Sequence, residues 1–215
     1  MNEEIELAAK TSGAIVAALA QESGVLGPVK VFADYISQRI GFYLAPKLAA
    51  RAQEAAKKIE ESGLPRRAFA ELDEPLLTAI LEGMAEETDP NLHDAWENLL
   101  ANSLVEGGAD VRRSFPHILQ ELEPADAARL NGLAPADRPE TDPTPIGSCL
   151  NDYPAGIEGL YNLDRLSLVR LTRTMPTTLD SIDDGLATTS GVTLTPLGKA
   201  FVDACSPPHG PGRAD

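Results

Sequence analysis

Residues 89–103 read Asp-Pro-Asn-Leu-His-Asp-Ala-Trp-Glu-Asn-Leu-Leu-Ala-Asn-Ser, and this stretch decides the fold. Asp89 is a good N-cap, and Pro90 suits the first helical position, where its missing N–H costs no hydrogen bond. The apolar side chains then recur at helical spacing and form one stripe around Trp96, the only tryptophan. The stretch therefore predicts an amphipathic helix at the centre of a helical core, with Trp96 inside that core.

Two polar residues of this helix have a spacing that metal sites also use. His93 and Glu97 are four positions apart, which can place two ligands on one ion, and Asp94 or His117 could be further ligands. Neither a cysteine nor a second histidine has a matching spacing. We therefore expect these side chains to lie on a solvated helix face, and we expect no metal site.

The helical period continues on both sides of the central stretch and predicts a mainly α-helical body over residues 1–132. Glycine and proline residues mark where its helices end and begin, and Pro46 predicts a break or kink. The expected helices cover residues 4–21, 28–43, 47–61, 76–84, 90–103, 115–122 and 124–130.

The C-terminal part of the chain has a different pattern. Residues 133–147 are rich in proline and are expected to form a loop or linker. Residues 148–205 show the order helix, strand, polar hairpin, strand, helix, which predicts a small winged-helix-like α+β module. Its strands are expected near residues 167–172 and 191–195. Residues 206–215 are rich in Pro and Gly and are expected to be a disordered tail.

The chain is acidic, with 33 acidic and 18 basic side chains and a formal net charge of −15. A protein that binds nucleic acid must offset the phosphate charge, and no segment of this chain is basic, so charge disfavours DNA and RNA as partners. The first ten residues are rich in glutamate, which is the wrong charge for a secretory leader. The apolar run 13–20 is too short to cross a bilayer. The expected location is the cytoplasm.

The two cysteines, Cys149 and Cys205, lie far apart in the sequence. They do not indicate a disulfide scaffold or a cysteine-rich metal site. Whether the two thiols lie close together in the fold stays open.

Two successive segments resemble a known family. Residues 96–102 read Trp-Glu-Asn-Leu-Leu-Ala-Asn, and residues 114–127 read Ser-Phe-Pro-His-Ile-Leu-Gln-Glu-Leu-Glu-Pro-Ala-Asp-Ala. They resemble the Abi-alpha (abortive infection alpha) family of bacterial phage-defence proteins. Its pattern is a Trp-x-x-Leu-Leu-Ala-Asn helix, then a Ser-Phe-x-x-Ile-Leu helix ending in Leu-x-Pro-x-Asp-Ala. The order of parts agrees over roughly residues 26–205, with one departure at Ser167, where the family has a glycine.

The resemblance implies a role in phage defence and supplies no catalytic residue. The candidate site residues are the motif residues Trp96, Asn98, Asn102 and Asp126. Two interpretations apply to the three polar residues. They could cap helices or form hydrogen bonds between helices, or they could bind a partner. Asp126 falls in the first turn of its helix, where free backbone N–H groups stabilise a carboxylate.

The resemblance, taken together with the residues, leads us to expect a non-enzymatic cytoplasmic protein of abortive-infection phage defence that acts through protein–protein contacts. The chain lacks a glycine-rich phosphate loop, a Gly-x-Ser-x-Gly elbow and a His-Glu-x-x-His motif, and no cofactor is expected. The expected partner is a host or phage protein, and a homo-oligomer is a further option.

Two alternatives stay open. A membrane-perturbing effector would lay the apolar stripe of residues 5–19 on a bilayer, although a glutamate-rich polar face with the single Lys10 favours packing instead. A winged-helix regulator would bind DNA, but the candidate recognition region has Glu158 and Asp164 beside only Arg165. We therefore expect the winged-helix-like shape to serve protein contacts.

Overall fold

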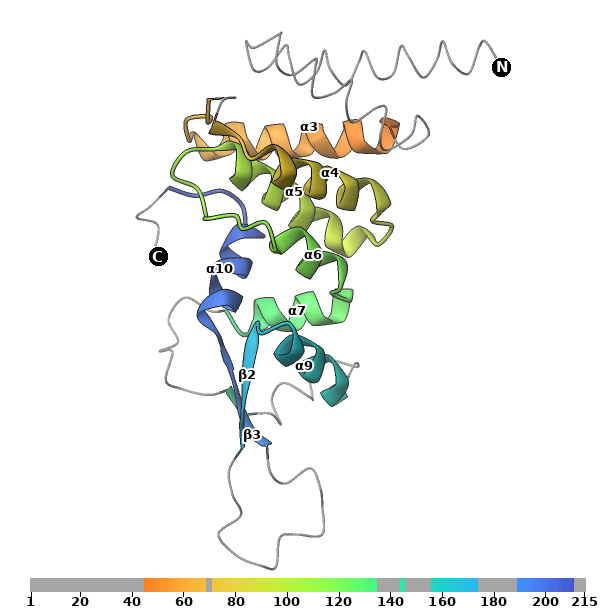
Figure 1. The fold of residues 1–215 in the computed structure, drawn as a ribbon, viewed down its shortest axis with the longest axis vertical. Helices are drawn as coiled ribbons and strands as arrows, with labels where there is room; N and C mark the ends of the chain where they lie inside the picture. The colour runs from red at the N-terminus through yellow and green to blue at the C-terminus, as the bar shows by residue number, and fades with distance from the viewer. Residues whose placement is uncertain (1–44, 69–70, 135–143, 146–155, 174–188, 211–215) are drawn as a thin grey trace, which may run out of the picture. The chain divides into compact units, whose positions relative to one another are not determined.

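The computed structural model describes residues 45–68, 71–134, 144–145, 156–173 and 189–210. The helices predicted over residues 4–21 and 28–43 lie outside these ranges, as does Cys149. Seven helices and three strands are present in the described ranges, so the fold is mainly α with a small α+β module, as predicted (Figure 1). No helix in these ranges is both long and apolar enough to span a lipid bilayer.

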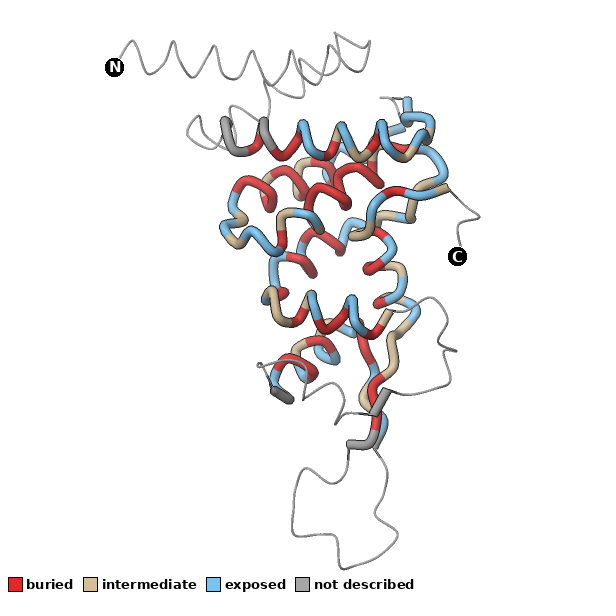
Figure 2. The backbone as a smooth tube through the Cα atoms, turned by 180° about the vertical axis from the view of Figure 1, so that it is seen from behind, coloured by how far each residue is buried: buried red, intermediate tan, exposed pale blue. Residues whose placement is uncertain are grey.

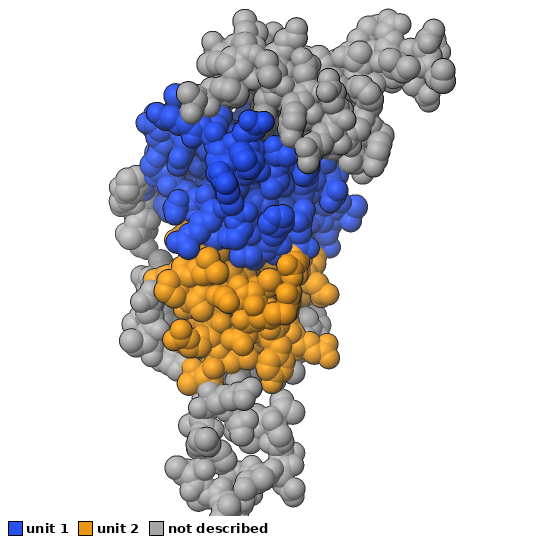
Figure 3. Space-filling view, viewed as in Figure 1, with its two compact units in different colours: residues 1–120, 204–213 blue, residues 121–203, 214–215 orange. Residues whose placement is uncertain are grey.

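The chain divides into two compact units, which Figure 3 shows in separate colours. Unit 1 contains residues 1–120 and 204–213, and unit 2 contains residues 121–203 and 214–215. The sequence predicts a boundary at residue 132, whereas the chain leaves unit 1 at residue 120. The reason is that the helix following Glu123 packs against a helix of unit 2.

Unit 1 contains, in its described residues, helices α3 (Ala45–Ser62), α4 (Glu74–Glu86), α5 (Pro90–Leu104) and α6 (Phe115–Gln120). Helix α5 begins as predicted, because the Asp89 carboxylate accepts a hydrogen bond from the backbone N–H of Asn91 at 2.9 Å and Pro90 follows. Helix α4 begins in the same way, with Asp73 accepting from the N–H of Leu76 at 3.3 Å. The local signals for helix starts therefore agree with the structure.

The core of unit 1 forms where α3, α4 and α5 pack on one another. Figure 2 shows buried residues along the facing sides of these helices. Among its described side chains, helix α3 contributes a narrow stripe of four buried apolar residues, Leu48, Ala52, Ala55 and Ile59. Two of the four are alanine, so the backbone of α3 can lie close to its neighbours there.

The described elements of unit 2 are α7 (Pro124–Gly132), β1 (Thr144–Pro145), α9 (Gly156–Arg165), β2 (Val169–Arg173), β3 (Thr189–Leu194) and α10 (Pro196–Ala204). The last residue of α10, Ala204, belongs to unit 1. The strands form an antiparallel sheet of order β1-β3-β2. In its register Val169 lies opposite Leu194, and Leu171 lies opposite Val192. The order α9, β2, β3, α10 is the order that the sequence predicts for the winged-helix-like module.

Helix α9 ends in a Schellman motif centred on Ser167. The N–H of Leu168 donates to the carbonyl oxygen of Leu163 at 2.9 Å, and the N–H of Ser167 donates to that of Asp164 at 2.9 Å. Ser167 has a φ of 60°, in the left-handed region that favours glycine. This left-handed backbone conformation explains why the family pattern has a glycine at the position.

Ser167→Gly is expected to raise the free energy of unfolding by about 0.5–1 kcal/mol, because glycine removes the Cβ clash of a left-handed residue. The hydrogen bond that Ser167 accepts from Thr195 Oγ1 goes to its backbone oxygen and is retained. Urea unfolding followed by circular dichroism measures the change. Ser167→Ala is the control and should give no gain; equal stability of the two variants would contradict the explanation.

The segment after α10 differs from the predicted disordered tail over residues 206–210. Pro208 is buried, and Gly210 lies close to the Leu64 side chain. These residues belong to unit 1, so its chain comes from two distant parts of the sequence. Local composition does not show this arrangement, because the groups that hold the segment come from α5.

Candidate functional site

Trp96 lies in the core of unit 1 and is fully buried. Its Nε1–H donates to Glu87 Oε2 at 3.3 Å. Gly83 of α4 lies against the indole so closely that a Cβ at that position would overlap the ring. The structure therefore places Trp96 among side chains that hold the helices together.

Asn98 and Asn102 lie one helical turn apart on α5, and both bind the segment 204–206; we call them the asparagine clamp. Asn98 Nδ2 donates to the carbonyl oxygen of Cys205 at 2.8 Å. Asn102 Nδ2 lies within hydrogen-bonding distance of the carbonyl oxygens of Asn98, Ala204 and Ser206, at 3.1, 3.0 and 2.8 Å. The carbonyl groups of residues 204–206 lie at the C-terminal end of α10 or just after it, where helical N–H partners run out.

The two asparagines of the clamp are buried, whereas Cys205 and Ser206 of the bound segment are half-buried. Asn102 Oδ1 accepts a hydrogen bond from the N–H of Ala109 at 3.2 Å, so both the nitrogen and the oxygen of the side-chain amide are hydrogen-bonded. Asn98 is 5% exposed, and its Oδ1 has no hydrogen-bond partner within the described residues. These contacts support the structural interpretation of the two asparagines, as residues whose hydrogen bonds hold the chain together.

Asn102→Ala is expected to lower the free energy of unfolding by about 2–3 kcal/mol, because the carbonyl groups of 204 and 206 and the N–H of Ala109 lose their partner. Urea unfolding followed by Trp96 fluorescence measures the change in unit 1. The exposed Asn131→Ala is the control and should change stability by about 0.5 kcal/mol or less. A similar effect of both variants would show that the clamp contributes nothing of its own.

Cys205 gives a chemical readout of the clamp. Burial raises the pKa of its thiol, so little reactive thiolate is present near neutral pH. In a Cys149→Ser background, Cys205 should react with Ellman's reagent about tenfold or more slowly in the folded chain than in denaturant. Asn102→Ala should speed this reaction; an unchanged rate would show that the segment is held without the clamp.

Asp126 belongs to a buried polar cluster of unit 2, formed with Arg129 and Asn162. Asp126 is 2% exposed and Arg129 is 1% exposed, and Arg129 Nη1 lies 3.4 Å from Asp126 Oδ1. Asn162 Nδ2 of α9 donates to Asp126 Oδ2 at 2.9 Å, with the Glu121 carbonyl oxygen at 3.3 Å. A Cβ at Gly159 would overlap Asp126 and Arg129, so only glycine lets α9 approach them this closely. The cluster joins α7 to α9.

A second polar network connects α3 to α4 and α5. The Arg51 guanidinium donates to the carbonyl oxygen of Glu87 at 2.8 Å, to that of Met84, and to His93 Nε2. These carbonyl groups lie at the C-terminal end of α4, where a cation is favoured. Burial lowers the pKa of Arg51, and the charges of Glu87 and Glu97 oppose that shift.

The solvated face predicted for His93 and Glu97 is wrong for Glu97. Glu97 is 6% exposed, and its Oε2 lies 2.8 Å from Lys58 Nζ, which also contacts Asp94 at 2.9 Å. His93 accepts from Arg51 instead, since an arginine can only donate. The two residues with metal-like spacing thus contact two different cations of α3. In the described ranges no three His, Cys, Asp or Glu side chains are grouped as metal ligands would be.

The structure does not bring the four motif residues into one site. Trp96, Asn98 and Asn102 lie in unit 1, and Asp126 lies in unit 2. Sequence reasoning missed Arg51, Arg129 and Asn162. Only the Asp126–Arg129 pair had a local signal, the three-residue spacing that brings helical side chains together.

Comparison with known proteins agrees with the resemblance seen in the central helices. The family model described as abortive infection alpha matches residues 47–205, which include the described residues of both units except a few at either end. The chain belongs to the abortive infection alpha family. Membership connects it with abortive infection, a form of phage defence, as the resemblance implies. Searches of curated proteins and of solved structures gave no match.

Proposed function

We propose that this chain is a non-enzymatic, cytoplasmic component of abortive-infection phage defence that acts through protein–protein contacts. The observation that supports the proposal is how the family-motif side chains are used. Trp96, the asparagine clamp and Asp126 point inward and are bonded within the chain. Side chains engaged in this way hold the fold together and are not accessible to a partner. A partner would therefore bind the exposed faces of the helices.

The charge of the chain supports a protein partner over a nucleic acid. A formal net charge of −15 repels phosphates and attracts cationic protein surfaces. Several carboxylates, such as those of Glu54 and Glu158, lie at exposed helix positions and have no ion-pair partner among the described residues. The partner is a host or phage protein that presents positive charge.

A phage-plating assay tests the role in defence. A bacterial host carrying the intact gene should show lower plating efficiency over a phage panel, with death of infected cells, than the same host with an empty vector. Unchanged plating and unchanged host survival over a broad panel would overturn the proposal. Fractionation of the tagged chain should recover it with the cytosolic proteins; recovery in the membrane fraction would contradict the cytoplasmic location.

Substitution of exposed polar residues tests the non-enzymatic part. His117→Ala and Asp94→Asn remove side chains that a metal or acid–base site would need, and both positions are exposed. We expect both variants to keep the defence phenotype. Loss of defence by a variant that keeps the unfolding curve and the partner binding of the parent chain would indicate a reaction centre and contradict the proposal.

Two binding measurements separate the remaining classes. Dye release from anionic liposomes would indicate a membrane effector. A shift of duplex DNA whose affinity falls steeply with salt would indicate a regulator. Either result would contradict action through protein contacts alone, and we expect neither.

A further inference from the structure

Over residues 158–165, whose side chains are described, one side of helix α9 packs against the fold and the other side is exposed. Gly159, Leu160 and Leu163 are buried, and Asn162 binds Asp126. On the opposite side Tyr161 is 46% exposed. It is the one large hydrophobic side chain that is exposed within the described residues. Single exposed tyrosines are ordinary, so the meaning of Tyr161 depends on its neighbours.

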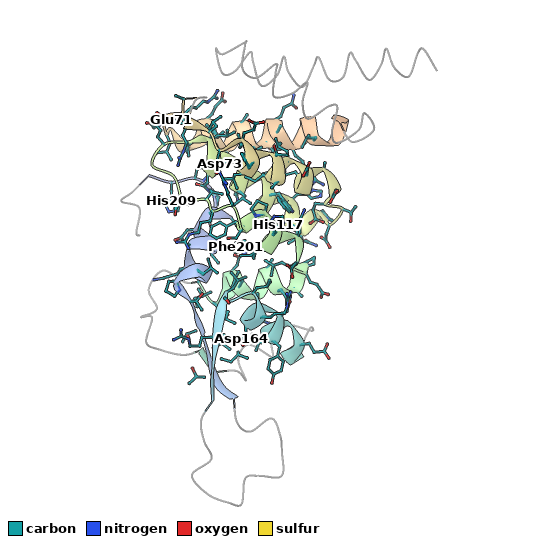
Figure 4. The ribbon with its side chains drawn as sticks, in the orientation of Figure 1. Glu71, Asp73, His117, Asp164, Phe201 and His209 are labelled. Carbon is teal, nitrogen blue, oxygen red and sulfur yellow. The ribbon has the colours of Figure 1, made fainter. Side chains whose placement is uncertain are left out.

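Tyr161 lies between two exposed carboxylates. Glu158 precedes it by three residues and Asp164 follows it by three, so both are its neighbours on the helix surface (Asp164 is labelled in Figure 4). Within the described residues neither carboxylate has an ion-pair partner. Arg165, the nearby cation, already binds Glu121 at 2.6 Å and Asn162 at 2.8 Å. We call Glu158, Tyr161 and Asp164 the α9 face.

From this arrangement we propose that the α9 face binds an arginine-bearing segment of a partner protein. The inference rests on the proposed action through protein contacts and names the chemistry of the partner. A guanidinium plane stacks on a tyrosine ring by a cation–π interaction and can donate two parallel hydrogen bonds to a carboxylate. The α9 face offers the ring and a carboxylate on each side of it. Tyrosine is also enriched among the residues that anchor protein interfaces.

Charge decides between an arginine-bearing protein and duplex DNA as the occupant of this face. Helix α9 is followed by the β2–β3 hairpin, the position of the helix that DNA-reading winged helices place in the major groove. A groove helix needs lysine or arginine toward the phosphates, whereas Glu158 and Asp164 would repel them. The same carboxylates attract a cationic segment. The helix thus has the position of a reading helix and the charge of a protein-binding surface.

The test is a titration of the full, isotope-labelled chain with the peptide acetyl-Gly-Arg-Gly-Arg-Gly-amide, followed by backbone amide chemical shifts. The ionic strength is about 0.15 M, which screens long-range attraction between exposed charges. We expect the largest shifts over residues 158–165. Peptides with lysine or glutamine in place of arginine should bind more weakly, because lysine lacks the planar fork and glutamine lacks the charge.

Variants of the exposed residues make the test specific. Tyr161→Ser should weaken binding about threefold to fivefold. The pair Glu158→Gln and Asp164→Gln should weaken it about fivefold. The matched control, Glu54→Gln with Glu106→Gln, removes the same charge from exposed positions of unit 1 and should change the affinity by about 1.5-fold or less. All variants should keep the unfolding curve of the parent chain.

Several outcomes would overturn the inference. They are equal weakening by the control pair, shifts spread over the acidic surface, or tighter binding of duplex DNA at the α9 face. In the plating assay, Tyr161→Ser should reduce protection. If that variant protects like the parent chain, the α9 face is not the contact surface, although the defence role stands. If the parent chain gives no protection while the peptide binds at α9, the defence role fails and the binding chemistry stands.

Discussion

Asp126→Ala is expected to lower the free energy of unfolding by about 3–5 kcal/mol, because it removes a carboxylate from beside a buried cation. The guanidinium of Arg129 is 1% exposed, so water cannot replace the lost charge. Asn162 also loses the oxygen to which it donates across the α7–α9 contact. Urea unfolding followed by circular dichroism at a helix wavelength measures the change.

A double-mutant cycle checks that the effect comes from this cluster. Asp126→Leu combined with Arg129→Met replaces both charges by apolar side chains of similar length. The double variant should be more stable than the sum of the single effects by about 1–3 kcal/mol. Strictly additive effects would show that Asp126 and Arg129 do not interact energetically.

Trp96→Ala is expected to cost about 3–5 kcal/mol, because it leaves a large cavity where α4 and α5 meet. That is a large part of the roughly 5–15 kcal/mol by which native domains are stable. Circular dichroism measures the unfolding curve, since the variant lacks the tryptophan signal. Trp96→Phe keeps a ring in the core and should cost less.

A loss below about 1 kcal/mol for Trp96→Ala would contradict the burial of the indole. The exposed Tyr161→Ala is the control and should stay within about 0.5 kcal/mol of the parent chain. The result also affects how defence assays are read. A Trp96 variant that fails to protect reports on folding, whereas a Tyr161 variant reports on a surface.

Local signals predict well the helices that the structure describes. The cap at Asp89, the proline at position 90 and the stripe around Trp96 all depend on residues within four positions of one another. The elements α9, β2, β3 and α10 are likewise each indicated by a local pattern, and their order along the chain follows from it. Each of these features is encoded in a short window, so periodicity and capping rules are sufficient to find it.

Contacts between distant residues could not be predicted in this way. Arg51 binds carbonyl groups 33 and 36 positions away, and Asn102 binds the carbonyl group of Ser206, 104 positions away. Every backbone carbonyl is an acceptor, so the sequence does not show which one a distant amide or guanidinium will meet. The prediction that Glu97 lies on a solvated face failed for the same reason. Its position off the apolar stripe of α5 does not show that Lys58 of α3 covers it.

The asparagine clamp has a consequence for how this protein can be dissected. Residues 1–120 expressed alone would leave the amides of Asn98 and Asn102 without the carbonyl groups of residues 204–206. Such a truncated product should be poorly folded until a synthetic peptide spanning residues 200–210 is added in trans. The first unit is a discontinuous domain, so a single cut in the gene cannot release it whole.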